Sequence, residues 1–223
     1  MSLIFGSAVY RNKKDKPYQD RSRLYTNRSP LVKAANRGQL FVVADGLGSV
    51  EESEIAADIA VKGLIEYFTT RREMKQILYK IHRQILLESK QKGHTGIGTT
   101  IAGVLIEPDF HTRVFNMGDS PIIQCREKEI IRRSEMHIDK KGILTSCLGG
   151  KEEFSGVYQE EFTFEVDDQI AIFSDGALEE KVELALRAFK GDPMGAANEA
   201  AQLSSLSGST DDITVIVLER ESD

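Results

Sequence analysis

Acidic residues stand at the ends of several hydrophobic segments of this sequence, and their carboxylates could bind a metal ion. Asp45 follows the run FVVA, Asp119 follows VFNM and one glycine, and Asp175 follows IAIFS. Asp20 and Asp211 instead precede strand-like segments. Carboxylates that converge in a poorly hydrated cleft repel one another, so such a group requires divalent cations or protons. Because these motifs contain no His or Cys, the expected ion is Mg²⁺ or Mn²⁺.

The glycines beside two of these acids have two interpretations. Gly46 follows Asp45, and a residue without a Cβ lets its backbone carbonyl approach a metal directly. An Asp-Gly pair after a strand is also a common turn, and any single pair is most often only that. The recurrence of acids at several strand ends favours the metal interpretation, provided that these strands are neighbours.

The hydrophobic pattern predicts the elements that would carry these acids. Helical spacing of apolar residues predicts two helices, one containing residues 55–64 and one containing residues 74–85, and a capping box of Ser49 and Glu52 places the start of the first one directly behind residues 45–48. Two further helices are expected at 177–189 and 196–203. Residues 132–153 are polar and lack periodicity, which predicts a surface loop. Strands are predicted at residues 3–9, 21–25, 39–44, 99–106, 112–117, 122–125, 160–164, 169–174 and 213–218.

The order of these elements favours an α+β fold. Strands follow one another at hairpin length and the helices fall into two blocks, whereas a parallel sheet requires alternating strands and helices. We therefore expect two packed antiparallel sheets with helix pairs outside. No repeat or linker divides the chain, so residues 1–223 are predicted to form a single domain.

Composition excludes several classes of function. The 223 residues carry a net charge of -6, and the basic residues are scattered, so binding to nucleic acid or to an anionic membrane is not expected. No apolar run approaches the roughly 18 residues that a membrane span requires. The start of the chain lacks a signal-peptide pattern, and two cysteines make no disulfide framework. We expect a cytoplasmic protein, and the sequence leaves its oligomeric state open.

An ordered series of motifs resembles a known family. The segments FVVADGLGS, GTTIAGVLI, VFNMGDS, LTSCLGG, IAIFSDG and STDDITVIVL occur in this order between about Gln19 and Leu218. This series is similar to that of the metal-dependent Ser/Thr protein phosphatases called PPM or PP2C, and especially to compact bacterial members. The resemblance implies a central antiparallel β-sandwich flanked by helix pairs, a four-layer αββα arrangement.

The resemblance also implies roles for individual residues in a centre of two Mn²⁺ or Mg²⁺ ions. Asp45 resembles the acid that bridges both ions, and Gly46 the residue that lends its carbonyl to one of them. Asp175 and Asp211 resemble the remaining ligands of the other ion. Asp20 matches the acid that supports the cluster from the first motif.

A third, weaker metal is implied at Asp119, which would hold it together with Asp175. The implied reaction is attack on phosphoserine or phosphothreonine by a metal-activated water, with Asp45, Asp175 and Asp211 forming the catalytic centre. The implied partner is a phosphorylated protein. No phosphoenzyme is required.

The phosphate-binding residue departs from the family pattern. Family members commonly carry an Arg where this sequence has Asp15. Arg11 lies further upstream, and a looped-out segment would let it bind phosphate instead. Lys13, Lys14 and Lys16 are rival candidates.

Other departures leave a second function open. Leu47 stands where some relatives have a His proposed as general acid, Pro121 replaces a frequent Arg, and the segment from there to Leu144 is shorter than in many relatives. The alternative is a pseudophosphatase that acts as a binding or scaffolding module. Retention of the mutually repelling carboxylates favours an active enzyme. A two-metal hydrolase acting on nucleotides or nucleic acid is disfavoured by the acidic balance of the chain.

Overall fold

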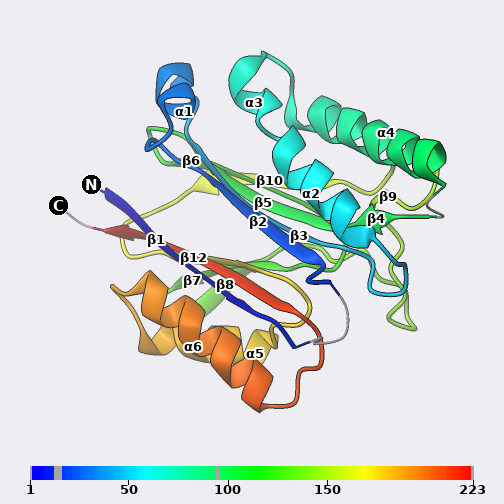
Figure 1. Ribbon diagram of the computed structural model, residues 1–223. Helices are drawn as coiled ribbons and strands as arrows, with labels where there is room; N and C mark the ends of the chain where they lie inside the picture. Colours follow the sequence, from blue (N-terminus) through cyan, green and yellow to red (C-terminus); the bar gives the residue numbers. More distant parts are fainter. Residues whose placement is uncertain (1, 13–16, 94–95, 222–223) are drawn as a thin grey trace.

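Two antiparallel sheets form the centre of the computed structural model, which describes residues 2–12, 17–93 and 96–221 (Figure 1). One sheet contains, in spatial order, β1 (Ser2–Tyr10), β12 (Ile213–Glu221), β11 (Gln169–Phe173), β7 (Ile122–Arg126) and β8 (Glu129–Arg133). The other contains β10 (Tyr158–Thr163), β6 (His111–Met117), β5 (Ile101–Ile106), β3 (Gln39–Asp45) and β2 (Asp20–Tyr25). A short pair joins β4 (Gly98–Thr99) to β9 (Leu148–Gly149).

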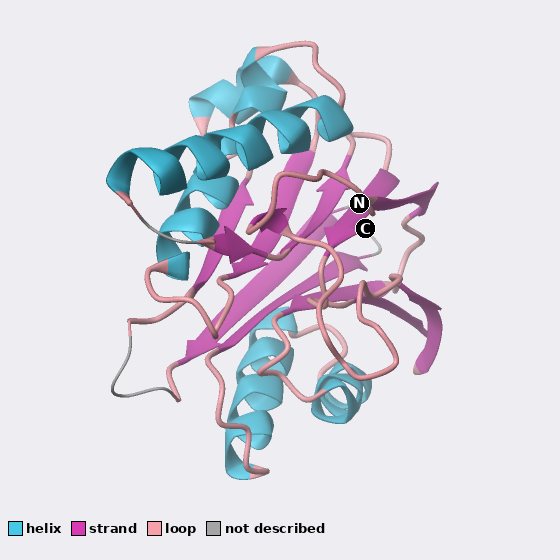
Figure 2. Cartoon of the chain, turned by 90° about the vertical axis from the view of Figure 1, so that its right-hand side faces the viewer, coloured by secondary structure: helices cyan, strands magenta, loops and turns pink. Residues whose placement is uncertain are grey.

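Helices cover the outer faces of both sheets, as Figure 2 shows from the side. The first block contains α1 (Pro30–Ala35), α2 (Ser53–Gly63), α3 (Glu66–Thr69) and α4 (Met74–Lys92), and the second contains α5 (Glu179–Ala188) and α6 (Pro193–Leu206). Central strands are buried on both faces: Phe41 and Val43 pack between the sheets, whereas Leu40 and Val42 pack under the first helix block. This arrangement confirms the predicted α+β sandwich with helix pairs outside.

Strand pairing brings the acidic strand ends together. Asp20, which begins β2, pairs directly with Asp45, which ends β3. In the other sheet, Phe173 of β11 pairs with Val215 of β12, so Asp175 and Asp211 lie beyond the same end of these strands. Antiparallel neighbours place the end of one strand beside the start of the next. The acids predicted at strand ends therefore share one rim of the sandwich.

Two local predictions are wrong. Helix α2 begins at Ser53, its N-cap Glu52 is left-handed with φ 64°, and no side chain caps it. The predicted capping box fails because Leu47 and Val50 close a backbone turn, in which the Val50 N–H donates to the Leu47 carbonyl over 2.9 Å. The predicted loop at 132–153 contains the end of β8 and all of β9. Short pairings between distant segments leave no periodic signal in the sequence.

No helix in the described ranges is both long and apolar enough to cross a membrane.

Candidate metal centre

A cavity of about 190 Å³ opens at the rim where the acidic strand ends meet. Its lining includes Asp45, Asp119, Asp175 and Asp211, which come from both sheets. The turn after β3 supplies one wall. The structure therefore brings together, around one hollow, the acids that the motifs singled out at separate points of the chain.

Asp20 lies behind this cavity and is almost fully buried. Its Oδ2 accepts hydrogen bonds from the hydroxyls of Ser174 and Thr214, each over 2.7 Å. Its Oδ1 is buried and has no hydrogen-bond partner among the described residues. Burial raises the pKa of Asp20 to about 6, because the charged form loses its water. Ser174 and Thr214 thus hold one oxygen, and the Asp20 carboxylate also lies close enough to that of Asp45 for each to shift the pKa of the other.

Asp45 is fixed through its backbone by two consecutive threonines. Its N–H donates to Oγ1 of Thr100 over 3.0 Å, and its carbonyl accepts from the Thr100 N–H and the Thr99 hydroxyl, each over 2.8 Å. Burial raises the pKa of Asp45 well above the ordinary value, and the negative charges of Asp20 and Asp175 raise it further. The backbone thus holds this carboxylate against the repulsion of its neighbours.

The glycines after two of the acids allow close backbone approach. A Cβ on Gly46 would lie 2.8 Å from the carbonyl carbon and oxygen of Ser53, and one on Gly176 would lie 2.0 Å from the carbonyl oxygen of Asp212. A side chain at position 46 would push the turn after Asp45 away from Ser53, and one at position 176 would push the turn after Asp175 away from Asp212. Both glycines are therefore required by packing, whether or not Gly46 binds a metal.

Asp211 and its neighbour Asp212 differ in their surroundings. The Asp212 carboxylate is buried and accepts backbone N–H bonds from Asn12 over 3.2 Å and from Gln19 over 3.3 Å. Asp211 instead lines the cavity, and one of its oxygens accepts the Asp212 N–H over 2.7 Å. Asp211 therefore lines the cavity and Asp212 does not, and the ligand role of Asp211 stays a prediction.

Asp119 is positioned by a turn that His137 stabilises. Nδ1 of His137 accepts the Gly118 N–H over 3.1 Å, and the His137 N–H donates to the Gly118 carbonyl over 2.9 Å. Burial and the charge of Asp175 raise the pKa of Asp119. No motif had pointed to His137, and the sequence gives no signal for it, because its contact with Gly118, which has φ 128°, forms only in the folded chain.

These side chains fit a hard divalent ion. They offer carboxylate oxygens only, they raise one another's pKa in a poorly hydrated site, and the Oδ1 of Asp20 has no other partner in the described part of the chain. Within the described ranges, no group of three or more His, Cys, Asp or Glu side chains is gathered closely enough to form a complete ligand set. Asp45 nevertheless lies close enough to Asp20 and Asp175 for their side chains to raise its pKa.

The expected phosphate-binding group does not line this cavity. Arg11 is exposed and follows directly after β1, and no Lys or Arg belongs to the described lining. Arg11 is nevertheless close to the rim, because the next residue, Asn12, donates from its side-chain amide to the Asp211 carbonyl over 2.8 Å. The rival residues Lys13, Lys14 and Lys16, like Asp15, lie outside the described residues.

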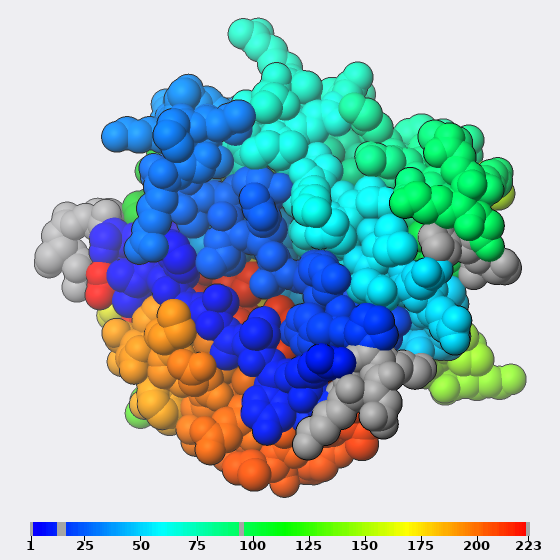
Figure 3. All heavy atoms as spheres, in the orientation of Figure 1, coloured from blue at the N-terminus to red at the C-terminus, as the bar shows by residue number. Residues whose placement is uncertain are grey.

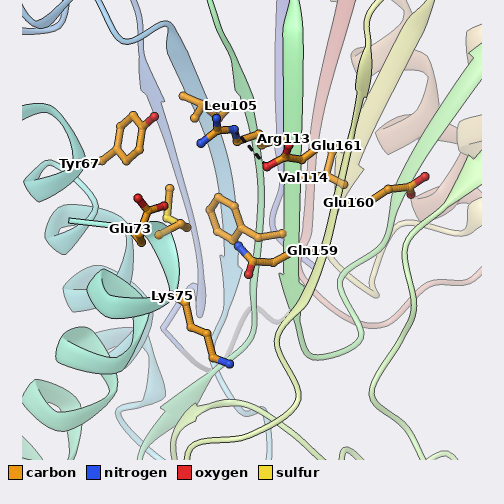
Figure 4. Close-up of a pocket in the computed structure, with 11 residues that line it drawn as sticks. Tyr67, Glu73, Lys75, Leu105, Arg113, Val114, Gln159, Glu160 and Glu161 are labelled. Carbon is orange, nitrogen blue, oxygen red and sulfur yellow. Dashed lines mark ion pairs between the residues drawn. The ribbon is translucent and has the colours of Figure 1, made fainter. Parts of the chain in front are cut away.

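A larger hollow of about 440 Å³ lies elsewhere, between the start of α4 and the strands β6 and β10 (Figure 4). Arg113 and Glu161 form an ion pair in it, with Nε and Oε1 3.3 Å apart. It contains none of the residues predicted to do chemistry. The smaller cavity at the acidic rim is therefore the candidate site.

Comparisons with solved structures agree on the fold. A serine/threonine phosphatase of S. agalactiae matches with a TM-score of 0.83 at 19% identity, covering 99% of this chain and 100% of that one. The phosphatase Stp1 of Staphylococcus aureus matches with a TM-score of 0.81 at 17% identity, covering 100% and 96%. A catalytic domain of the phosphatase PstP, solved with two manganese ions, matches with a TM-score of 0.76 at 18% identity, covering 99% of both chains.

Sequence comparison assigns the family. Comparison with curated proteins gives no significant match. The sequence profile described as "Protein phosphatase 2C" matches residues 10–203, which include Asp20, Asp45, Asp119 and Asp175. With most of its length matched and its fold shared, the chain belongs to the protein phosphatase 2C family.

Proposed function

We propose that this chain is an active protein serine/threonine phosphatase that requires Mn²⁺ or Mg²⁺ and acts on phosphorylated proteins. One observation carries the proposal: Asp45, Asp119, Asp175 and Asp211 line a single cavity, with Asp20 directly behind it. Divalent ions bound there would supply a nucleophilic water at neutral pH and neutralise phosphate oxygens. Family membership supports the same reaction class.

The residues of the chain have distinct tasks in this proposal. Asp45, with Asp20 behind it, is the centre of the ligand set, and Asp175 and Asp211 complete it from the other sheet. Asp119 holds a weaker third ion together with Asp175. Gly46 contributes its carbonyl, and Thr100 holds Asp45 in place through the backbone. Arg11 binds the substrate phosphate at the edge of the site.

The alternative, a pseudophosphatase that binds without turnover, also has an observation in its favour. The described lining of the cavity contains no basic side chain, and a phosphate dianion approaching these carboxylates would be repelled until cations or an arginine offset their charge. The two proposals differ in turnover, because a scaffolding module would bind its partner without releasing phosphate.

Hydrolysis of a phosphothreonine peptide by the purified protein tests the proposal. We expect phosphate release with Mn²⁺ or Mg²⁺, none with EDTA, and recovery when Mn²⁺ is added back in excess. A phosphodiester substrate serves as the control for a nucleic-acid hydrolase and is expected to remain intact. Binding of the peptide without phosphate release in Mn²⁺ would establish the pseudophosphatase instead.

A further inference from the structure

A groove of about 420 Å³ lies beside the candidate metal centre, between the end of β1 and the last turns of α6. Figure 3 shows this surface, with the blue end of β1 against the orange helix. Exposed apolar groups stand along it: Tyr10 is 47% exposed, Val9 61% and Leu206 75%. Water contact at these side chains is unfavourable, and covering them would stabilise a complex.

The groove has no charged lining among the described residues, although 29% of the chain is charged. Its polar groups are neutral, as in Ser205 and Gln202. An acidic or basic segment would lose hydration there without gaining an ion pair. The chemistry of the groove thus selects an apolar side chain.

Hydrogen bonds connect this groove to the candidate centre through one residue, Asn12. Its side-chain oxygen accepts from the Ser205 hydroxyl over 3.1 Å, and Ser205 lines the groove. Its side-chain amide donates to the carbonyl of Asp211, which lines the metal cavity. Arg11 stands in the chain between Tyr10 of the groove and Asn12. Asn12 therefore links a residue of the groove to a residue of the acidic rim.

We propose that this groove receives an apolar side chain of the phosphoprotein substrate, close in sequence to the phosphorylated residue. The proposal rests on the proposed phosphatase function and adds a substrate class: phosphosites with a neighbouring leucine-like residue. An extended substrate that runs from the acidic rim toward Asn12 would pass the end of β1 and reach the groove. The positive charge of Arg11 complements the phosphate, and the groove complements the apolar neighbour.

Paired peptides test this selection. One set of phosphothreonine peptides carries a single leucine moved through the positions around the phosphothreonine, and the matched peptide carries serine throughout. We expect kcat/KM to be roughly tenfold higher for the best leucine peptide, the factor that partial burial of a leucine supplies. Leu206→Ser, alone and combined with Tyr10→Ser, should lower the leucine-to-serine ratio of kcat/KM to about one. The reason is that KM for the leucine peptide should rise. Hydrolysis of a small aryl phosphate should not change.

A matched control and a second readout make the result decisive. Leu184→Ser removes a leucine that is 52% exposed on α5, outside this groove, and should keep the wild-type ratio. Fluorescence anisotropy of labelled, non-hydrolysable phosphonate analogues of the peptides in Mn²⁺ measures binding without turnover and should give the same ranking. Absence of hydrolysis with a preserved ranking would refute the phosphatase function alone. An unchanged ratio in the groove variants would refute the groove proposal alone.

A second copy of the chain is the competing occupant, since β1 is an edge strand of its sheet. Sedimentation of the wild type and of Leu206→Ser distinguishes it. We expect both proteins to sediment alike at assay concentrations. A dimer that Leu206→Ser dissociates would overturn the proposal.

Discussion

The Ser174 hydroxyl donates a hydrogen bond to Oδ2 of Asp20 over 2.7 Å and thereby joins the two sheets at the acidic rim. Ser174 follows β11 of one sheet, and Asp20 begins β2 of the other. Thr214 of β12 donates to the same oxygen over 2.7 Å. With Oδ2 doubly held, the carboxylate presents Oδ1, which has no other described partner, toward the side where Asp45 lies.

Ser174→Ala should therefore weaken metal activation. Loss of one donor lets the Asp20 carboxylate turn, and removal of such supporting hydrogen bonds typically costs ten- to a hundredfold in metal affinity. The Mn²⁺ concentration for half-maximal phosphatase activity should rise by roughly tenfold or more. The control is Thr112→Val, which removes a buried, hydrogen-bonded hydroxyl near the start of β6, the end that lies away from the acidic rim. Equal Mn²⁺ requirements in both variants would argue against a supporting role for Ser174.

Asp119→Ala should distinguish the proposed weaker metal site from the tighter ones by its effect on Mn²⁺ binding. Asp119 stands on the turn after β6, whereas Asp20 and Asp45 form a directly paired site in β2 and β3. We expect a lower rate with little loss of the tightest Mn²⁺ binding in calorimetry. Disappearance of the tightest site in this variant would show that Asp119 belongs to the principal centre.

Arg11→Ala should raise KM for a phosphopeptide by on the order of tenfold, as expected for loss of a charged hydrogen bond. If Arg11 contacts only the phosphate, KM for a small aryl phosphate should rise equally. If it also contacts the peptide, the aryl phosphate should be less affected. Unchanged KM for both substrates would transfer the role to the metals or to one of Lys13, Lys14 and Lys16.

His82 should make the stability of the fold pH-dependent at a place remote from the acids. It is fully buried in α4, and its Nδ1 accepts the Gly149 N–H of β9 over 3.1 Å. Burial lowers the pKa of His82 below its ordinary 6.5. The unfolded chain therefore takes up the proton first, and this residue's contribution to stability falls as pH decreases below about 6.5.

Urea unfolding of wild type and His82→Gln measures this contribution. The stability advantage of the wild type should shrink between about pH 7.5 and about pH 5.5, because only the wild type carries the buried imidazole. The variant serves as the reference, since the carboxylates titrate alike in both proteins. An advantage that stays constant or grows toward low pH would contradict the assignment.

Much of the fold was predictable because burial leaves a strong pattern. The runs FVVAD and IAIFS are apolar on both faces, and they form central strands β3 and β11. Pairings such as β4 with β9 involve two residues on each side and depend on distant partners. Residues 30–35 form α1, which begins with Pro30 and is too short to give a periodic signal.

The acids of the candidate site were predictable for a related reason, since each stands where a strand begins or ends. The residues that hold these acids in place were not predictable from the sequence. Ser174 and Thr214 act across the sandwich on Asp20, a contact between residues 154 and 194 positions away, respectively. The left-handed Gly118 and its partner His137 likewise meet only through folding. The role of Arg11 stays a prediction, because it does not line the cavity.

Turnover by Asp45→Asn tests the proposed metal centre directly. This change removes a charge from the acid that would be central to metal binding, and the Asp109→Asn variant, in a distant turn, is the control. With a phosphothreonine peptide and Mn²⁺, we expect Asp45→Asn to fall to the level that EDTA gives with the wild type, while its fold survives and the control stays active. Near-wild-type turnover by Asp45→Asn would contradict a metal-dependent phosphatase built on this rim.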